Sequence, residues 1–265
     1  MLSRDELTRY SRNIFLEQIG RAGQERLKAA RVFVIGAGGL GSPVLQYLAA
    51  AGVGHLACID SDQLDLTNLQ RQVLYSTADI GRPKALVAAE RLQALNPDIE
   101  IQPIVDKFTP ANALGYVRGY DLLIETSDNF PTKFLANDVA YFSRIPLVTG
   151  GILRFEGQVL AVDPGRSACY RCIFERVPPA DAVPNCAQAG VIGALAGVVG
   201  SLQAAEALKI LTGAGQSLAG HLLSLDLLET VVRRLAIARN DRCVLCGDHA
   251  EIFSIEKKNY DETRG

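Results

Sequence analysis

Glycines are concentrated in one short stretch of the sequence, between an apolar run and a helical pattern. They are Gly36, Gly38, Gly39 and Gly41. The apolar run 32–35 predicts a buried strand, and the pattern at 43–51 predicts a helix. Glycine permits a tight turn and lets backbone N–H groups approach a phosphate, whose charge the positive end of the helix dipole stabilises. The stretch therefore predicts a phosphate-binding loop.

Acidic residues follow two further predicted strands. Asp60 comes directly after the strand 55–59, and Asp128 follows the strand 121–125. A carboxylate at the carboxyl end of such a strand can accept hydrogen bonds from ribose hydroxyls, which is the role predicted for Asp60. Asp128 is placed to bind Mg²⁺, which prefers one or two carboxylates together with phosphate oxygens. The alternative interpretation of Asp128 is a cap for the helix 133–142.

Cationic side chains lie close to these groups in the sequence. Arg71 belongs to the segment NLQRQ, which begins at Asn68 and ends at Gln72, and Lys84 belongs to GRPKA. A dinucleotide presents only a pyrophosphate, for which the loop and the helix terminus normally suffice. Arginine can clamp phosphate oxygens with its planar fork, whereas lysine acts as a mobile point charge. The additional cations therefore indicate a triphosphate.

Four of the six cysteines form two pairs with the same C-x-x-C spacing. These are Cys169 with Cys172 and Cys243 with Cys246. Two such pairs predict a closed, tetrahedral zinc site that joins the C-terminal tail to the body, and four thiolates leave no open position for catalysis. Incidental thiols and a redox C-x-x-C are the alternatives. We rank the redox motif lower because neither pair is expected to open a helix after a thioredoxin-like strand. Cys58 is predicted to be a core residue.

Composition limits the function classes. The chain has 265 residues and a net charge of −2, which gives no broad basic field for nucleic acid. The N-terminus lacks the apolar run of a signal peptide, so we expect a cytoplasmic protein with reduced cysteines. The apolar segment 187–205 has the length of a membrane span, but its glycines favour a buried helix packed closely against other backbone.

Alternating strand and helix patterns predict an α/β fold, doubly wound and Rossmann-like, with a mostly parallel sheet as far as residue 149. A mixed or antiparallel part follows, with strands at 155–162 and 221–226 and a long helix at 194–212. Gly150, Gly151 and Gly157 predict a turn, and 227–238 fits either helix or strand. Helices are predicted at 83–95 and 112–117 and strands at 99–105 and 145–149. We expect one domain over 1–265. Its parts are a helical lead-in 1–30, a nucleotide-binding half 31–150, a second half 151–250 with the zinc site, and a tail 251–265. Ser3 and Glu6 predict a capping box at the start of the lead-in.

Together these motifs resemble the bacterial MoeB/ThiF adenylyltransferases, a family related to ubiquitin-activating E1 enzymes. The resemblance rests on GAGGLG, Asp60, NLQRQ, Lys84, the SDN segment containing Asp128, both C-x-x-C pairs and NCAQAG around Cys186. It covers nearly the whole chain, from about residue 7 to residue 247. The order of the motifs is specific, whereas the glycine pattern alone is not.

The resemblance implies ATP-dependent adenylylation of the C-terminal glycine carboxylate of a small ubiquitin-like sulfur carrier ending in Gly-Gly, with release of pyrophosphate. The implied nucleotide-binding residues are Gly36, Gly38, Gly39, Gly41, Asp60, Asp62, Asn68, Leu69, Gln70, Arg71, Lys84, Asp128 and Asn129, with Mg²⁺ on Asp128. The implied catalytic residues are Arg12, Arg71, Lys84, Asp128 and Cys186. By the same resemblance Arg12 reaches the phosphates of a partner subunit, which requires a homodimer, and the second half of the chain binds the carrier.

Two points stay open within this resemblance. In similar proteins a cysteine at the position of Cys186 can link covalently to the activated carrier, but some members adenylylate without it, so a spectator thiol is the alternative. The chain is too short for an attached rhodanese domain, and we therefore expect a separate sulfur donor protein. The sequence does not identify the carrier or its pathway, whether thiamin, molybdopterin or another sulfur route.

Other functions give a poorer account of the same residues. An NAD-dependent oxidoreductase would explain the glycines and Asp60, but it would leave Arg71, Lys84 and Asp128 without a role. An E1-like enzyme that activates a tRNA base carboxylate would use the same ATP site, but the sequence has no broad basic tail. A non-enzymatic scaffold would not require the cationic and acidic positions to be intact.

Overall fold

The structure is a computed structural model that describes residues 1–179 and 189–261. One eight-stranded sheet runs through the described part, in the order β3-β2-β1-β4-β5-β6-β7-β8. Neighbouring strands from β3 to β5 are parallel, and those from β5 to β8 are antiparallel. The strands are β1 (Arg31–Ile35), β2 (His55–Ile59), β3 (Glu100–Ile104), β4 (Leu122–Glu125), β5 (Leu147–Leu153), β6 (Glu156–Val162), β7 (His221–Asp226) and β8 (Val231–Ala236). This confirms the predicted parallel sheet with an antiparallel extension.

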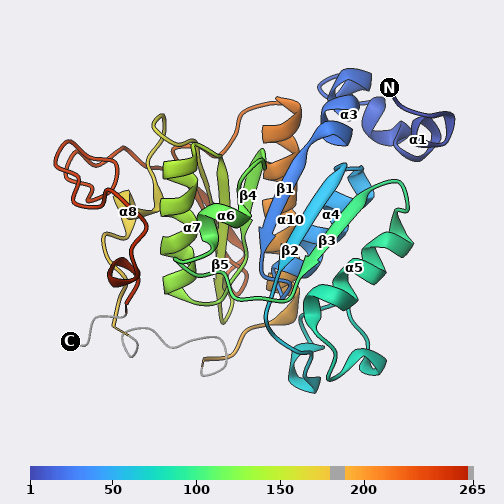
Figure 1. Ribbon diagram of the computed structural model, residues 1–265. Helices are drawn as coiled ribbons and strands as arrows, with labels where there is room; N and C mark the ends of the chain where they lie inside the picture. Colours follow the sequence, from blue (N-terminus) through green and yellow to red (C-terminus); the bar gives the residue numbers. More distant parts are fainter. Residues whose placement is uncertain (180–188, 262–265) are drawn as a thin grey trace.

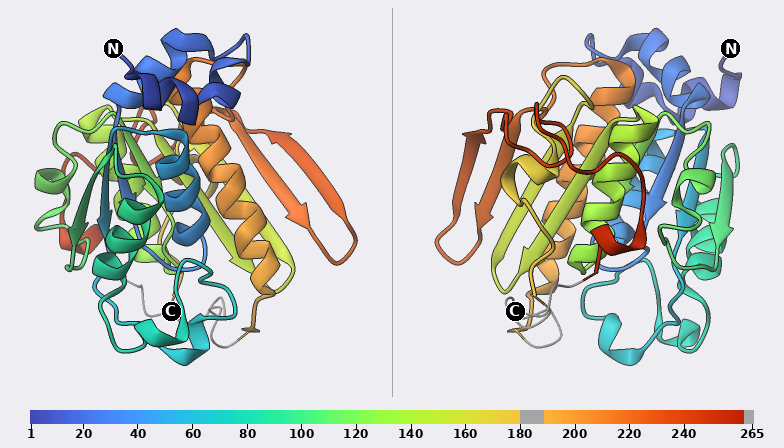
Figure 2. Two further views of the ribbon diagram at one scale, coloured as in Figure 1. Left: turned by 90° about the vertical axis from the view of Figure 1, so that its right-hand side faces the viewer. Right: turned by 60° about the vertical axis from the view of Figure 1, so that its left-hand side comes forward.

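Helices cover both faces of the sheet, as Figures 1 and 2 show. The lead-in forms α1 (Arg4–Arg9), α2 (Ser11–Ile14) and α3 (Gly20–Ala29), and the predicted capping box at Ser3 is present. The remaining helices are α4 (Gly41–Ala51), α5 (Lys84–Leu95), α6 (Ala113–Tyr116), α7 (Phe130–Ser143), α8 (Tyr170–Ile173) and α10 (Gly193–Thr212), with short 3₁₀ turns η1 (Leu66–Asn68), η2 (Thr77–Asp79) and η3 (Lys257–Asn259).

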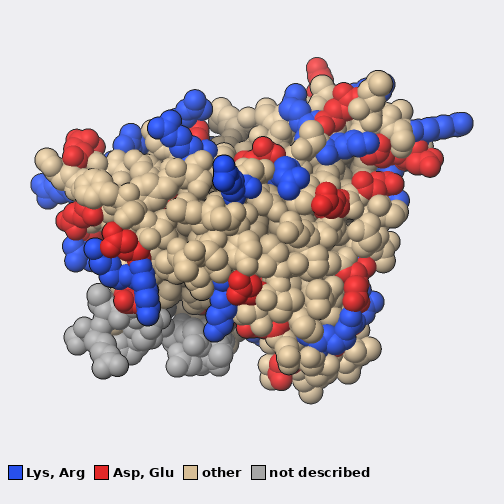
Figure 3. All heavy atoms as spheres, viewed as in Figure 1, with Lys and Arg blue, Asp and Glu red and all other residues tan. Residues whose placement is uncertain are grey.

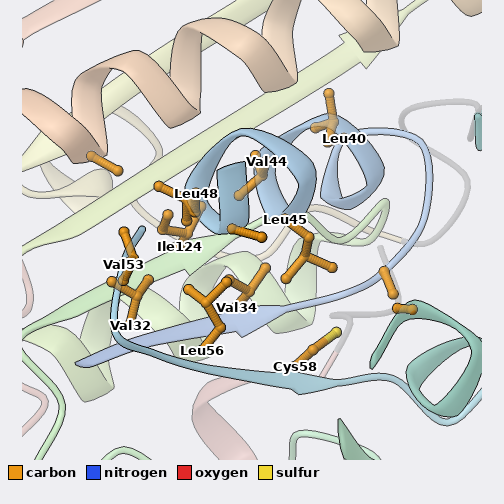
Figure 4. Close-up of a cluster of buried hydrophobic side chains, with 14 of the residues drawn as sticks. Val32, Val34, Leu40, Val44, Leu45, Leu48, Val53, Leu56, Cys58 and Ile124 are labelled. Atoms are coloured by element: carbon orange, nitrogen blue, oxygen red, sulfur yellow. The ribbon is translucent and has the colours of Figure 1, made fainter. Parts of the chain in front are cut away.

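The core has two halves because alternate residues of each buried strand point to opposite faces. On β1, Val32 and Val34 pack with α4, α5 and α10, whereas Phe33 and Ile35 pack with α6, α7 and the cysteine pairs. Figure 4 shows the first half, where Leu48 and its neighbours on α4 lie over the strands. Cys58 is part of this half and is 1% exposed, which confirms its prediction as core.

Helix α10 packs closely against the nucleotide-binding half. A Cβ added at Gly200 would overlap the ring of Pro43 and the carbonyl oxygen of Leu40 at the start of α4, so only glycine allows this approach. Its Leu195 and Val199 are fully buried. By length and composition alone, α10 is the one described helix that could cross a membrane.

One local prediction needs correction, and one open alternative is decided. Gly150 and Gly151 do not form a turn but lie inside β5, because Gln203 of α10 packs onto the strand: a Cβ on Gly150 would lie 2.7 Å from its Cδ. Gly157 likewise lies within β6. The segment 227–238, which the sequence left open between helix and strand, contains a turn and the edge strand β8 at Val231–Ala236. On the face shown in Figure 3, acidic and basic side chains are interspersed, consistent with the near-neutral composition.

Candidate active site

The predicted site residues gather where β1, β2 and β4 end. Residue Ile35 of β1 pairs with Ile59 of β2 and with Glu125 of β4, so the carboxyl ends of the three strands lie at the same edge. Strands β2 and β4 flank β1 on opposite sides. The winding of the chain therefore reverses at β1, and open α/β sheets bind their ligands outside such a switch point.

The glycine loop connects β1 to α4 at this edge. Gly36 has a φ of 97°, a conformation that favours glycine, and a Cβ there would lie 2.9 Å from the hydroxyl oxygen of Thr126. A Cβ on Gly41 would overlap the carbonyl oxygen of Gly36. Side chains are therefore excluded at these two positions, which leaves backbone N–H groups at the start of α4 accessible to a ligand.

Asp60 holds the glycine loop in place. Its Oδ2 accepts a hydrogen bond from the backbone N–H of Ala37 at 2.8 Å, and its Oδ1 accepts one from the N–H of Asp62 at 2.8 Å. Burial raises the pKa of Asp60, against the opposing effect of these two hydrogen bonds. Each carboxylate oxygen retains acceptor capacity, so the side chain can also receive ribose hydroxyls.

Arg71 lies directly beside the glycine loop. A Cβ on Gly39 would be 3.4 Å from Cγ of Arg71, while Nη1 of Arg71 donates a hydrogen bond to the carbonyl of Thr67 at 3.1 Å. Asn68 has a local role here, because its Oδ1 accepts the N–H of Asp65 at 3.2 Å in a capping box for η1. The aliphatic part of the Arg71 side chain therefore lies against the glycine loop, and Asn68 stabilises the turn that precedes Arg71.

Leu69 and Gln70, the two residues between Asn68 and Arg71, differ in burial. Leu69 packs against the core, and the carbonyl of the exposed Gln70 lies so close to Gly193 of α10 that no side chain fits there. These contacts dock the NLQRQ segment onto the long helix. For Leu69 and Gln70, direct nucleotide contact remains a prediction.

Lys84 brings a buried cation to the same edge. Its side chain is 7% exposed, and its Nζ lies 2.9 Å from Oδ2 of Asp62, whose own side chain is 66% exposed. Lys84 also lowers the pKa of Asp60 by charge, so the two groups interact. An ammonium this buried, with a solvent-exposed partner, is available to a second anion that approaches from solvent.

Asp128 stands in the turn between β4 and α7. The cap of α7 is not Asp128, as the alternative interpretation had it, but Asn129, whose Oδ1 accepts the N–H of Thr132 at 3.0 Å. Asp128 is exposed, and within the described residues the structure records no hydrogen bond or ion pair to its carboxylate. It is therefore free to bind a cation, while Asn129 serves the helix.

Two residues of this edge were missed by sequence reasoning. Thr126 donates its hydroxyl to the carbonyls of Ile35 at 2.8 Å and Gly36 at 2.9 Å, and the hydroxyl of Tyr75 donates to the carbonyl of Ala37 at 2.7 Å. Both residues fix the carbonyl side of the glycine loop. The position of Thr126, directly after a buried strand, was the available signal.

Two predicted residues are not brought to the site by this structure. Arg12 lies on α2, in the lead-in at the amino end of β1, whereas the loop 62–84 lies at its carboxyl end, as Figure 1 shows in blue and cyan. Tyr10 anchors this lead-in, because it is 3% exposed and its hydroxyl accepts Nδ2 of Asn96 at 2.8 Å. Cys186 lies outside the described residues.

The four paired cysteines meet in one cluster. Their sulfur atoms all lie within 4.8 Å of one another, and the recorded Sγ–Sγ distances are 3.8 Å for Cys169–Cys172, 3.6 Å for Cys169–Cys243, 3.5 Å for Cys169–Cys246 and 3.4 Å for Cys172–Cys246. Tetrahedral zinc with Zn–S bonds of about 2.3 Å needs sulfurs about 3.8 Å apart. The donor set and its spacing therefore fit a structural Zn²⁺.

The argument against the redox alternative is wrong in one part, the absence of a helix after a cysteine pair. Cys169 is the N-cap of α8, so the first pair does open a short helix. The convergence of all four sulfurs favours a metal nonetheless. One of the two residues between the first pair, Arg171, connects the cluster to α7. Arg171 binds both oxygens of the buried Asp138 at 2.8 Å, and Tyr260 of the tail donates to the same carboxylate at 3.0 Å.

Comparison with known proteins places these features in a family. The profile of the ThiF family matches residues 10–245. The chain belongs to the ThiF family. The "Sulfur carrier protein adenylyltransferase" of Thermus thermophilus is 53% identical to this ThiF-family protein over 251 residues, which cover 93% of each chain. The "SAMP-activating enzyme E1" of Haloferax volcanii is 44% identical over 262 residues, 99% of this chain and 96% of the relative.

Solved structures agree with the family assignment. The crystal structure of Escherichia coli MccB with ATP superposes with a TM-score of 0.77 at 27% sequence identity, covering 90% of this ThiF-family chain and 73% of MccB. Because the match extends over most of both chains, the fold is shared beyond the glycine loop, through the antiparallel part of the sheet.

Proposed function

We propose that this protein adenylylates the C-terminal glycine carboxylate of a small ubiquitin-like sulfur carrier, with ATP as the nucleotide donor. The proposal is carried by the convergence, at one edge of the sheet, of the glycine loop, the loop-holding Asp60, the cations Arg71 and Lys84, and the exposed Asp128. The names of the Thermus and Haloferax relatives support a protein carrier as substrate. The likeness to MccB, crystallised with ATP, supports the nucleotide.

The reaction needs charge stabilisation more than proton transfer. An oxygen of the carrier carboxylate attacks the α-phosphorus of ATP, and the bond from that phosphorus to the bridging oxygen breaks, so that pyrophosphate leaves with the electron pair. The carboxylate is ionised at neutral pH and needs no general base. Negative charge builds on the phosphates, and preorganised cations are the groups that stabilise it. We assign this role to Arg71 and Lys84.

Asp128 is the residue that would hold Mg²⁺. Its exposed carboxylate lies at the edge where the phosphates are proposed to lie, and Mg²⁺ is commonly bound by one or two carboxylates plus phosphate oxygens. When bound, the ion supplies further neutralisation of the triphosphate. The NAD-dependent alternative gives neither Asp128 nor Lys84 a function.

A homodimer completes the site in this proposal. Arg12 lies in the lead-in at the amino end of β1, whereas the proposed nucleotide site lies at the carboxyl end of that strand. It is therefore too distant to act in the site of its own chain. Phe15 and Leu16, close to it in sequence, have exposed fractions of 73% and 51%. Exposed apolar side chains next to a cation are suited to a subunit contact that would place Arg12 in the partner's site.

The test is carrier-dependent exchange between ATP and labelled pyrophosphate. The purified protein is incubated with ATP, Mg²⁺ and candidate carriers that end in Gly-Gly, and mass spectrometry detects the acyl-adenylate. The matched control is each carrier without its last glycine. Exchange that requires the intact carrier supports the proposal. Binding of NADH, with no exchange for any carrier, would overturn it in favour of the oxidoreductase.

A further inference from the structure

A fully buried carboxylate lies beneath the turn that carries Asp128. Glu125, the last residue of β4, is 0% exposed and accepts four hydrogen bonds. Its Oε1 accepts the backbone N–H of Ser127 at 2.6 Å and the hydroxyl of the same residue. Its Oε2 accepts Nζ of Lys133 at 2.8 Å and the hydroxyl of Thr149 at 2.7 Å. A charge held this far from water requires such compensation, so the cluster is costly to maintain and is expected to have a function.

These bonds fix the turn on both sides of Asp128. On one side, the N–H and the hydroxyl of Ser127, the residue directly before Asp128, bind a single oxygen of Glu125. On the other side, Asn129 caps α7, and Lys133 in the same helix binds the second oxygen of Glu125. The residues on both sides of the exposed Asp128 are thus bound, through Ser127 and through Lys133 of α7, to the same buried carboxylate.

Lys133 extends the attachment to the neighbouring strand. Its side chain is 8% exposed, and besides Glu125 its Nζ donates to the carbonyl of Gly150 on β5 at 2.5 Å. Helix α7 lies over β4 and β5 in Figure 1, and this ammonium connects all three elements. The first turns of α7, and with them the position of Asp128, are therefore fixed relative to the sheet edge.

We propose that Glu125 and Lys133 are positioning residues that hold the carboxylate of Asp128 where it binds the Mg²⁺ of the ATP complex. The proposal rests on the function proposed above. Both residues are buried beneath the turn and would act through Ser127 and α7.

The isosteric change Glu125→Gln tests this role sharply. A carboxylate offers two acceptor oxygens, and here four donors use them, whereas an amide accepts at one oxygen only and donates from its nitrogen. Glutamine must therefore turn its NH₂ group either toward the ammonium of Lys133 and the hydroxyl of Thr149, or toward the two donors of Ser127. In both orientations one attachment of the turn is lost while the volume of the side chain is kept.

Glu206 provides a matched control. It is a 2% exposed carboxylate that pairs with Lys209 at 2.6 Å and accepts the backbone N–H of Leu218, which is the same donor chemistry in another place. It lies on α10, about 20 Å along the helix from the first residue, Gly193, which abuts the NLQRQ segment. Glu206→Gln therefore measures the general cost of replacing a buried, paired glutamate.

The experiment measures how Mg²⁺ changes the binding of a fluorescent ATP analogue, and how the rate of carrier-dependent exchange depends on Mg²⁺ concentration. For Glu125→Gln we expect the half-saturating Mg²⁺ concentration to rise about tenfold to a hundredfold, the usual effect of losing a residue that orients a metal ligand. Analogue affinity without Mg²⁺ and the apparent KM for the carrier should stay within about twofold of wild type, as should all values for Glu206→Gln.

The outcomes separate this inference from the proposed function. A folded Glu125→Gln protein with wild-type Mg²⁺ dependence overturns the positioning role, as does an equal shift in Glu206→Gln. If Glu125→Gln fails to fold, Ser127→Ala replaces it. This variant keeps the ion pair and the backbone N–H bond but removes the hydroxyl bond to Glu125, so a smaller rise in the half-saturating Mg²⁺ concentration is expected, and an unchanged Mg²⁺ dependence would again overturn the role. If wild-type protein binds ATP with Mg²⁺ but no carrier supports exchange, the failure belongs to the proposed function alone.

Discussion

Replacing Lys84 by methionine separates the catalytic role of its charge from its contribution to the fold. Methionine keeps the apolar stem of this 7% exposed side chain and removes only the ammonium. Its partner Asp62 is 66% exposed and is solvated by water after the change. An ion pair with one end in solvent contributes about 1 kcal/mol or less, which corresponds to a decrease in Tm of about 2–4 °C for a chain of this size.

The effect on catalysis should be much larger. A preorganised cation that meets the charge developing on the phosphates contributes about 3 kcal/mol, so Lys84→Met should lower kcat/KM for carrier-dependent pyrophosphate exchange at least about a hundredfold. The loss arises because the ammonium, already buried beside Asp60, is oriented before the reaction begins. Arg71→Ala should have a loss of similar size.

The assay pairs exchange kinetics with thermal unfolding of the same preparations. Lys209→Met is the control, since it also removes the ammonium of an ion pair, here with the buried Glu206 at 2.6 Å near the C-terminal end of α10 and away from the proposed site. Its exchange rate should match that of wild type. A folded Lys84→Met protein that retains exchange within about threefold of wild type would remove Lys84 from the mechanism and refute the reasoning from burial and charge.

The glycine loop, the cysteine cluster and a buried aspartate give three further predictions. Gly41→Ala forces a Cβ against the carbonyl of Gly36, so calorimetry should show ATP affinity reduced by about tenfold or more, with Gly115→Ala, at a site with open space, unchanged. Removing zinc with a chelator should lower Tm and make Cys172 reactive toward thiol reagents, because metal-binding energy is folding energy at such sites; an unchanged Tm with full metal loss would contradict this. Burial raises the pKa of Asp79, but hydrogen bonds from Arg91 and Ser76 outweigh that effect and hold the pKa at about 2. Its contribution to stability is therefore present above about pH 4 and lost as the pH falls toward 2, so urea unfolding should show Asp79→Asn less stable than wild type at pH 6, with the difference shrinking at pH 3; a constant difference would refute the assignment.

Strands and helices with a clear period were predictable from the sequence. The strand 221–226 was placed at its observed bounds, and the buried strands β1 and β2 were within one residue. The segment 227–238 could not be decided, because β8 is an edge strand whose residues are mostly exposed and therefore show little alternation. The glycines of β5 suggested a turn, but the structure shows that glycine is needed there because Gln203 of α10 packs against the strand. That contact joins segments distant in the sequence, so the sequence pattern could not indicate it.

The candidate site follows the same division. Residues that end strands, such as Asp60 and Asp128, could be placed at one edge because parallel strands share their direction. The role proposed for Glu125 could not be read from the sequence, since its partner Thr149 comes from another strand. The role proposed for Arg12 requires a second subunit, so it depends on contacts that lie outside one chain.

The contact of Gly200 with the first turn of α4 limits how such an enzyme can be recombined. Because Gly200 meets the backbone carbonyl of Leu40 and the rigid ring of Pro43, no flexible side chain can be adjusted to absorb a misfit when segments from two relatives are joined. A chimaera with its crossover between residues 150 and 190 would combine an α10 and an α4 that had not diverged together. We therefore expect viable shuffled variants to inherit both helices from the same parent.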